Sequence, residues 1–185
     1  IYDDALLKIY NVPVLYFPKF FHPDPTVKRQ SGFLMPQVID SSSLGLSFKI
    51  PYYKVISDNK DLTFTPRIFS ENEALFQNEY RQVNKNSKHV ADFSLKEKNS
   101  TSKTHFFSNS ITKLNINTFD VSEIELNLET TSDNSYLKTH NIESSINDNQ
   151  SLLRSFLIFR GNSRDMNLET KIESYEDLTK DRSSD

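Results

Sequence analysis

KRQSGFLMPQVIDSSSLGLSFKIPYYKVISDNKDLTFTPRIF, residues 28–69, decides the fold of this chain. Within it, residues 44–53 and residues 61–68 each alternate between apolar and polar side chains. A period of two is typical of a β-strand that presents one apolar face. Residues 57–60, with the sequence SDNK, have the composition of a turn. The stretch therefore predicts a β-hairpin.

Each strand of this predicted hairpin contains a proline, Pro51 in the first and Pro66 in the second. Proline has no backbone N–H to donate to a neighbouring strand, and it is normally confined to sheet edges, strand starts and bulges. We therefore expect two adjacent strands whose pairing is locally weakened. From the residues alone, this weakness is either a tolerated irregularity of the sheet or a place that is built to open.

Composition narrows the class of protein. The chain of 185 residues has 22 basic and 25 acidic residues, and these charges are scattered along it. A nucleic-acid groove would need a concentrated basic face, so no nucleic-acid partner is expected. Cysteine and tryptophan are absent, which excludes disulfides, zinc ribbons and thiol nucleophiles within these residues. No window approaches the roughly 18 consecutive apolar residues of a transmembrane helix, whereas the shorter alternating strands of a membrane barrel remain compatible with the sequence.

The first part of the chain predicts a separate β-structure. Residues 5–22 are apolar and aromatic, and they predict two short strands joined by a turn at Asn11. A linker rich in proline follows them. Because the sequence begins at Ile1 inside a strand-like run, we expect the chain to be a piece of a longer protein.

Alternating segments recur after the hairpin. The predicted strands are residues 73–83, 89–98, 104–116, 118–131, 152–160 and 165–175. Residues 73–83 also fit a helix, and Ile111 interrupts the phase of its strand and indicates a bulge or a bend. Residues 132–150 are polar and predict a large exposed loop. Together, the hairpin and these alternating segments predict an all-β fold with about eight antiparallel strands in up-and-down order.

Several predicted strands carry polar residues along one face. The clearest is the row Glu123, Glu125 and Glu129, which we expect to be hydrated. In a soluble sandwich such faces would form the outer surface. In a membrane barrel they would line a water-filled lumen, and the apolar faces would meet lipid. Alternation alone is compatible with both arrangements.

Few residues have the pattern of a catalytic or metal site. His22 lies close to Asp24, but prolines intervene and no third ligand is near. His89, His105 and His140 are isolated and predicted to be solvated. Glycine-rich phosphate loops, GxSxG elbows and Ser/His/Asp groupings are absent from the sequence. We therefore predict no enzyme, no cofactor and no metal.

Three motifs in order carry a resemblance to a known family. They are VPVLYFPKFFHPDPTVKRQSGFLMP, SSSLGLSFKIPYYKVISDNKDLTFTPRI and NEYR, and the match is dense over residues 9–81. On these motifs the chain resembles the junction region of the LptD family, also called organic solvent tolerance proteins or OstA, which assemble lipopolysaccharide (LPS) at the outer membrane of Gram-negative bacteria. One departure is Lys54, where the family usually has a tryptophan after PYY. This departure puts an interfacial aromatic anchor in doubt.

The resemblance implies a fold and a place in the cell. Residues 1–25 would be the C-terminal end of a periplasmic β-jellyroll, residues 26–43 a linker into the barrel, and residues 44–185 the first strands, about eight, of a transmembrane β-barrel. The protein would lie in the outer membrane with a periplasmic N-terminal portion. Its partners would be LPS, an LptE-like plug lipoprotein, and an LptA-like periplasmic bridge protein that meets the upstream jellyroll.

The resemblance also implies a route for LPS. In the family, LPS passes from the jellyroll through a lateral seam at the first barrel strand, and prolines in the first two strands weaken this lateral gate. By motif position these prolines are Pro51 and Pro66. Lys28 and Arg29 in the linker are either ordinary charges beside a turn or contacts to lipid phosphates near the seam. The alternative function is a soluble β-sandwich module that binds glycans or lipids.

Overall fold

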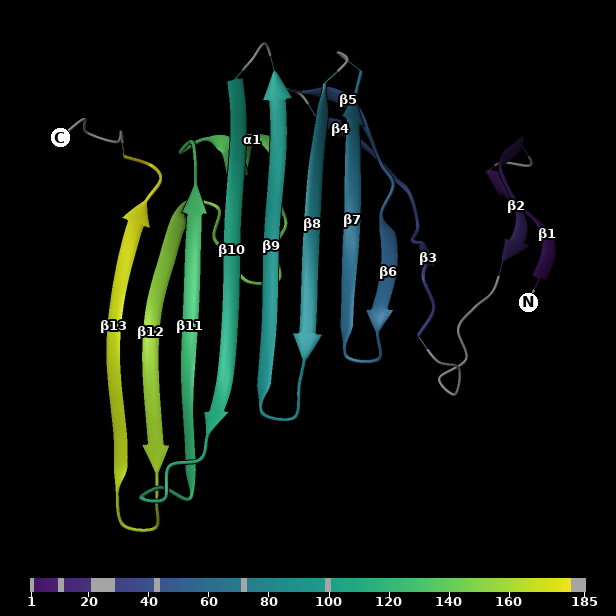
Figure 1. Cartoon of the computed structure of the whole chain (residues 1–185). Helices are drawn as coiled ribbons and strands as arrows, with labels where there is room; N and C mark the ends of the chain where they lie inside the picture. The colour runs from purple at the N-terminus through teal and green to yellow at the C-terminus, as the bar shows by residue number, and fades with distance from the viewer. Residues whose placement is uncertain are drawn as a thin grey trace. The chain divides into compact units, whose positions relative to one another are not determined.

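The chain folds into two compact units, residues 1–30 and residues 31–185. The computed structural model describes residues 2–9, 12–20, 29–41, 44–70, 73–98 and 101–180. In these ranges the structure is almost entirely antiparallel β, with one short helix (Figure 1). The predicted all-β fold class is therefore confirmed. None of the described helical segments has the length and apolar character needed to cross a membrane.

The first unit contains one hairpin. Its strands are β1 (Tyr2–Ile9) and β2 (Val12–Phe20), paired antiparallel with a register shift between Leu7 and Lys8. This confirms the two short strands predicted in residues 5–22. The predicted turn residue Asn11 and the His22–Asp24 pair lie outside the described residues.

The second unit contains an 11-stranded antiparallel sheet. Its strands are β3 (Gly32–Phe33), β4 (Gln37–Ser41), β5 (Gly45–Lys49), β6 (Tyr52–Ser57), β7 (Lys60–Phe69), β8 (Ala74–Val83), β9 (Ser87–Lys98), β10 (Thr101–Leu114), β11 (Val121–Thr131), β12 (Leu152–Asn162) and β13 (Asn167–Asp177). From β7 to β13 each strand pairs with the next one in the chain. On the other side of β7 lie β5 and β6, which pair in turn with β4 and β3.

This order confirms the predicted antiparallel up-and-down succession. The β6–β7 hairpin turns at residues 58–59, as the sequence SDNK predicted. Residues 73–83 form β8, so the helical alternative for them is wrong. The predicted bulge at Ile111 is also wrong, because Ile111 pairs in unbroken register with Lys88 and Glu125. Residues 26–43, expected to form a linker, contain β3 and β4 in their described part.

The two faces of the sheet differ in polarity. On one face, called the inner face here, side chains such as Asp61, Asp92 and Lys96 are buried. On the other, the outer face, large apolar side chains such as Phe93 and Leu95 are exposed. Residues paired across neighbouring strands share a face, so the outer face carries a band of exposed apolar side chains, with at least one on each strand from β7 to β13. It includes Phe64, Phe76, Phe93, Leu95, Phe106, Leu126, Leu128, Leu157 and Ile172, all at least 36% exposed.

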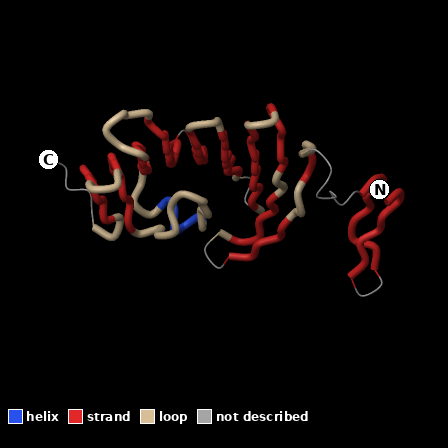
Figure 2. The backbone as a smooth tube through the Cα atoms, turned by 90° about the horizontal axis from the view of Figure 1, so that it is seen from below, coloured by secondary structure: helices blue, strands red, loops and turns tan. Residues whose placement is uncertain are grey.

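Residues 132–151, called the strap here, connect β11 to β12 and fold back over the inner face. Figure 2 shows the sheet curved, with the helix and its loop inside the curve. The strap contains the helix α1 (Tyr136–His140), which ends at Asn141 in the left-handed conformation. Tyr136, Leu137 and Ile142 are at most 4% exposed. The predicted large exposed loop is therefore wrong, because the strap contributes apolar side chains to a core.

This core lies between the strap and the sheet. It consists of Phe69, Leu75, Phe107, Tyr136, Leu137, Ile142, Leu153 and Leu178. The sheet supplies members from β7, β8, β10 and β12, which are distant in the sequence. The strap is therefore fixed by hydrophobic burial on an otherwise polar face.

Candidate functional site

The strand predicted over residues 44–53 is interrupted at its proline. β5 ends at Lys49 and β6 begins at Tyr52, with Ile50 and Pro51 between them outside any strand. Both halves nevertheless pair with β7 in one register, since Phe48 pairs with Ile68 and Tyr52 with Phe64. Continuing that register places Ile50 opposite Pro66. β5 and β6 are thus one strand with a local interruption, and we call Ile50, Pro51 and Pro66 the proline break.

Pro66 weakens the pairing between β5 and β7. The Ile50 N–H donates to the Pro66 carbonyl oxygen at 3.1 Å. Opposed residues at such a position of an antiparallel ladder normally exchange two hydrogen bonds. Proline has no N–H to return to the Ile50 oxygen. One of the two bonds is therefore missing.

Pro51 weakens the other edge of the same strand. Its carbonyl oxygen accepts a hydrogen bond of 2.9 Å from the Leu34 N–H. The N–H that proline lacks would face the same side. The segment of the protein that pairs with this edge is itself interrupted between β3 and β4, where Pro36 lies. The strand formed by β5 and β6 therefore lacks one backbone hydrogen bond on each edge, at the adjacent residues Ile50 and Pro51.

The outer side of the proline break is an apolar groove. Its volume is about 370 Å³, and it is lined by Phe33, Ile50, Tyr52, Phe64 and Pro66. The Phe33 and Tyr52 rings meet edge to face at 5.0 Å between centroids. Among the described residues that line this groove, the only polar side-chain group is the tyrosine hydroxyl.

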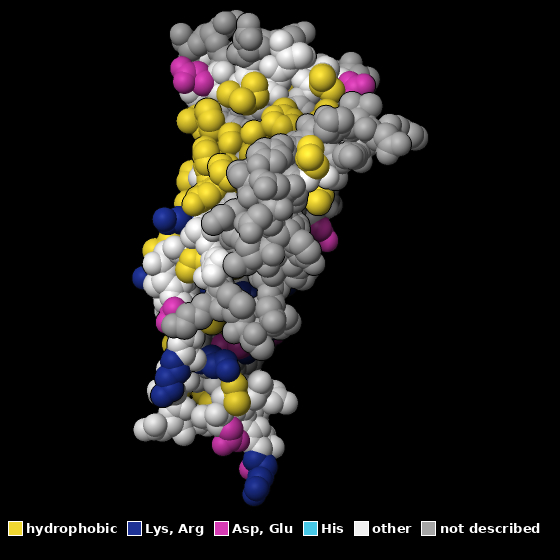
Figure 3. Space-filling model, turned by 90° about the vertical axis from the view of Figure 1, so that its right-hand side faces the viewer, with side chains coloured by type: hydrophobic (Ala, Val, Ile, Leu, Met, Phe, Trp, Pro, Cys, Tyr) yellow, Lys and Arg dark blue, Asp and Glu magenta, His cyan; other side chains and the backbone are white. Residues whose placement is uncertain are grey.

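Exposed apolar side chains continue along β4, β5 and β7. Val38, Phe48 and Ile68 are directly opposed across these strands and are 67%, 39% and 55% exposed. In Figure 3 hydrophobic side chains gather in the upper part of the visible surface, at the level where Figure 1 draws β4 and β5, whereas Lys and Arg lie lower. The outer face near the proline break is thus suited to an apolar environment.

The inner side of the proline break is polar and hydrogen-bonded. Arg67, which follows Pro66, is only 5% exposed. Its guanidinium donates from Nη1 to the His140 carbonyl oxygen at 2.6 Å and from Nε to Ser47 Oγ at 3.0 Å. Ser47 Oγ in turn donates to the Ile39 carbonyl oxygen at 3.1 Å. This chain of bonds joins α1 to β7, β5 and β4.

His140 is buried rather than solvated, so the prediction for it is wrong. Its Nδ1 lies 3.0 Å from the Tyr136 carbonyl oxygen and its Nε2 lies 2.8 Å from Lys96 Nζ. A carbonyl oxygen only accepts and an ammonium only donates. His140 is therefore neutral, with its proton on Nδ1. Lys96 also forms a 2.5 Å ion pair with Glu73.

His105 is buried as well, which corrects a second prediction. Its Nδ1 lies 2.6 Å from Ser94 Oγ, and its Nε2 lies 3.4 Å from Asp92 Oδ1. Ser94 Oγ also lies 2.7 Å from the Tyr136 hydroxyl oxygen. The hydroxyl of the strap thereby joins a buried polar network on β9 and β10. His89 is half-buried and bonded to two serines, Ser87 and Ser110.

The predicted row of hydrated glutamates is in fact paired. Glu123 and Glu125 both form ion pairs with Arg160, at 3.2 and 2.9 Å. Glu129 is only 9% exposed, and its carboxylate accepts hydrogen bonds from Asn127 and from Asn147 of the strap. The row therefore holds the strap and β12 in place.

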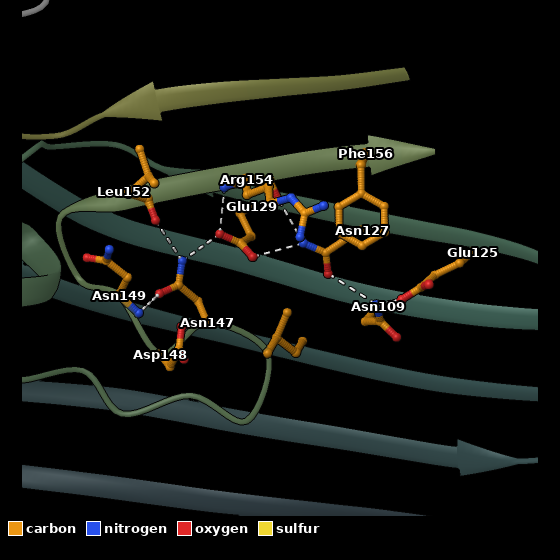
Figure 4. A pocket seen from close by; sticks show the side chains of 11 residues that line it. Asn109, Glu125, Asn127, Glu129, Asn147, Asp148, Asn149, Leu152, Arg154 and Phe156 are labelled. Carbon is orange, nitrogen blue, oxygen red and sulfur yellow. Dashed lines mark hydrogen bonds between the residues drawn. The ribbon is translucent and has the colours of Figure 1, made fainter. Parts of the chain in front are cut away.

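A polar pocket of about 400 Å³ lies beside Glu129, between β10, β11, β12 and the strap (Figure 4). Its lining is mostly amide and carboxylate side chains. Across the part of the chain that the structure describes, no three His, Asp or Glu side chains gather as metal ligands would.

The neutral His140 makes the strap sensitive to pH. Burial lowers the pKa of His140, and so do the positive charges of Lys96 on β9, Lys103 on β10 and Arg67 on β7, although the hydrogen bond to the Tyr136 carbonyl acts in the opposite direction. The carboxylate of Glu73, which precedes β8, lies on the other side of Lys96 from His140 and forms an ion pair with Lys96. The pKa of His140 in the folded protein lies below the unfolded value of about 6.5. The contribution of neutral His140 to the stability of the strap is therefore fully present above that pH. This contribution is lost as the pH drops below about 6.5 towards the folded pKa.

We therefore expect α1 to open more readily at pH 5.5 than at pH 8. The measurement is the hydrogen-exchange protection of the Thr139, Asn141 and Ile142 amides, which are bonded within the strap, corrected for the intrinsic effect of pH. His140→Gln should remove most of the dependence, whereas the matched variant His89→Gln should keep it. An equal dependence in the His140 variant would contradict this assignment.

Comparison with known proteins identifies the family. The sequence profile described as LptD protein matches residues 1–183. The chain belongs to the LptD family. Three curated relatives, each named LPS-assembly protein LptD, illustrate the similarity. The protein of Polaromonas sp. (strain JS666) is 40% identical over 81 residues, which is 44% of this chain and 10% of that protein.

The other two relatives give similar values. The Yersinia enterocolitica LptD is 42% identical over 80 residues, covering 43% of this chain and 10% of the relative. The Pseudoalteromonas atlantica LptD is 30% identical over 102 residues, covering 55% and 13%. The matched part thus spans about a tenth of the length of these LptD proteins.

The residues that the LptD resemblance singled out have different positions. Pro51 and Pro66 lie at one level of neighbouring strands. Arg29 is exposed and belongs to the first unit, and Lys28 lies outside the described residues. Sequence reasoning missed the contacts of Arg67 and Ser47 and the burial of His140. A signal was available for Arg67, because the alternation of residues 61–69 places this charged residue on the same face as Asp61 and Phe69.

Proposed function

We propose that this LptD-family chain forms part of an outer-membrane β-barrel that assembles LPS. The polar inner face would line the lumen and the apolar outer face would meet lipid. A soluble sandwich would bury the apolar face against a second sheet, whereas the described residues of the second unit form a single sheet that leaves this face exposed. The proposed role requires transport of an amphiphile and no catalysis.

The finer proposal is that LPS leaves laterally where the strand formed by β5 and β6 yields. The observation that carries it is the proline break, which weakens both edges of this strand between an apolar groove and a polar inner face. An amphiphile has an apolar part that suits the groove and a polar part that suits the inner face. Pro51 and Pro66 are the proposed gate residues.

The remaining parts of the proposal come from the family. Residues 1–25 would end a periplasmic jellyroll that receives LPS from an LptA-like bridge protein, and an LptE-like lipoprotein would plug the barrel. Lys28 and Arg29 would meet lipid phosphates, because Lys and Arg pair strongly with such groups.

The test is the double variant Pro51→Ala and Pro66→Ala in the full-length protein. Each alanine supplies a backbone N–H, and each restored hydrogen bond contributes about 0.5–1.5 kcal/mol. We expect export to slow by about tenfold, since 1.4 kcal/mol changes an equilibrium by that factor. The measurement is the fraction of newly made LPS that reaches the cell surface, together with sensitivity to a large antibiotic.

The matched control is Pro13→Ala, because Pro13 lies within β2 of the first unit and pairs with Lys8. This variant should export LPS at the normal rate. Unchanged export and unchanged antibiotic sensitivity in the double variant would rule out the gate, provided that the protein is present at its normal level.

A further inference from the structure

The inner side of the proline break carries two opposed cations. Lys49, the last residue of β5, pairs directly with Arg67 of β7. Lys49 precedes Ile50 in the chain, and Arg67 follows Pro66. Like charges directly opposite each other destabilise a strand pair. The two strands therefore repel each other next to the position where a backbone hydrogen bond is already missing.

The strap supplies acceptors to both cations. Lys49 Nζ lies 3.3 Å from Glu143 Oε2, and Arg67 Nη1 donates to the His140 carbonyl oxygen at 2.6 Å. These two acceptors are three residues apart on the strap. The strap thus bridges β5 and β7 across the inner side of the proline break.

Arg67 adds a side-chain bond across the same strand pair. Its Nε donates to Ser47 Oγ of β5 at 3.0 Å, while its Nη1 is held by the strap. This bond joins β7 to β5 where the Pro66 backbone has no N–H to donate. The guanidinium is oriented for both contacts by its fixed planar geometry.

The strap is anchored firmly enough to hold these groups. Gln77 Nε2 of β8 donates to the Glu143 carbonyl oxygen at 2.6 Å, and Ser145 Oγ donates to Glu79 at 2.8 Å. Tyr136 and Asn147 bond to β9 and β11. The strap is therefore fixed to strands that lie outside the proline break, and it can transmit their rigidity to β5.

We propose that the strap is an internal clamp that keeps the strand formed by β5 and β6 attached to β7, with Lys49 and Arg67 as positioning residues. When the strap withdraws, the two cations lose their acceptors and repel, and the strand yields at the proline break. This inference rests on the proposed function of that break. It assigns to residues 132–151 control over when the break opens.

The test uses hydrogen exchange in the full-length protein in detergent, under conditions in which exchange reports the opening equilibrium. The main readout is the Ile50 amide, which bonds to Pro66, with amides of β13 as an internal reference. Glu143→Gln removes the carboxylate beside Lys49 and should speed Ile50 exchange by about twofold to fivefold, the range of a cross-strand charge pair. Glu143 is mostly exposed, with 69% of its side chain accessible, so this variant should fold.

Two further variants sharpen the result. Lys49→Glu, combined with Glu143→Gln so that no strap carboxylate opposes the new one, places opposite charges across the strand pair and should slow Ile50 exchange and LPS export relative to Glu143→Gln alone. Arg67→Met removes the buried charged hydrogen bonds and should speed exchange by more than about tenfold. Arg160→Met is its matched control, because Arg160 is an inner-face arginine on β12 that pairs with Glu123, Glu125 and Glu169. Asp148→Asn, an exposed carboxylate of the same strap, is the control for Glu143.

Exchange of Ile50 that is the same in Glu143→Gln, in Lys49→Glu combined with Glu143→Gln, and in Asp148→Asn would overturn the clamp. The alanine double variant separates this failure from that of the proposed function. If replacing the prolines slows export while the strap variants leave Ile50 exchange unchanged, only the clamp is wrong. If the strap variants change Ile50 exchange while the prolines have no effect on export, the clamp on the strand stands and the export gate is wrong.

Discussion

Replacing Tyr136 with alanine is expected to lower the free energy of opening the strap by about 3–5 kcal/mol, the cost of removing a large aromatic side chain from a core. Tyr136 is fully buried, at 0% exposure, between the strap and the sheet. Its ring packs in the cluster that includes Phe107 and Leu137. The cluster around it also includes Phe69 and Leu75 of the sheet, so truncation removes contacts on both sides of the core.

Tyr136→Phe separates packing from hydrogen bonding. This variant keeps the ring and removes the hydroxyl that lies 2.7 Å from Ser94 Oγ. The expected loss is about 0.5–1.5 kcal/mol, the net contribution of a hydrogen bond. Native-state hydrogen exchange of the strap amides at residues 139–142 measures both values. Equal losses in the two variants would show that the hydroxyl, rather than the buried ring, holds the strap.

The sheet could be predicted because its signal is local. Strand and turn residues between residues 44 and 69 follow a period of two and a compact turn motif, and the structure places a hairpin there. The prolines also predicted a weakness, since a missing N–H is a property of the residue itself. The edges on which the two missing donors lie follow from the register, which the sequence does not show. Pro51 and Pro66 turn out to weaken opposite edges of one strand.

The strap could not be predicted, because its burial depends on distant residues. Residues 132–150 contain few apolar side chains, and Tyr136, Leu137 and Ile142 gain their partners from β7, β8, β10 and β12. The prediction that the histidines are solvated was wrong for the same reason. His105 and His140 have no charged neighbour in sequence that indicates burial, and their partners come from other strands and from the strap. Helical spacing of Tyr136, Leu137 and His140 was the one available signal.

Glu73→Gln is expected to have the second large effect. Glu73 forms a 2.5 Å ion pair with Lys96, and the two side chains are only 10% and 9% exposed. Removing one partner of a buried ion pair leaves an uncompensated charge and costs about 3–5 kcal/mol. Lys96 cannot move freely to water, because it donates to His140 Nε2 and lies 5.6 Å from the centre of the Phe69 ring. The loss should therefore appear in the stability of the strap as well as in that of β8 and β9.

The double variant Glu73→Gln with Lys96→Met distinguishes the cost of an unpaired Lys96 charge from the cost of losing the packing contacts of Glu73. Methionine is an apolar side chain of similar length, and replacing both members of a buried ion pair with uncharged groups is often nearly neutral. We expect the double variant to recover most of the loss of the single one, apart from about 1 kcal/mol for the bond to His140. Urea unfolding of the full-length protein in detergent, with strap amide exchange alongside, measures this. A double variant as unstable as Glu73→Gln alone would mean that Lys96 carries no unpaired-charge penalty, and that Glu73 stabilises the fold by its own packing.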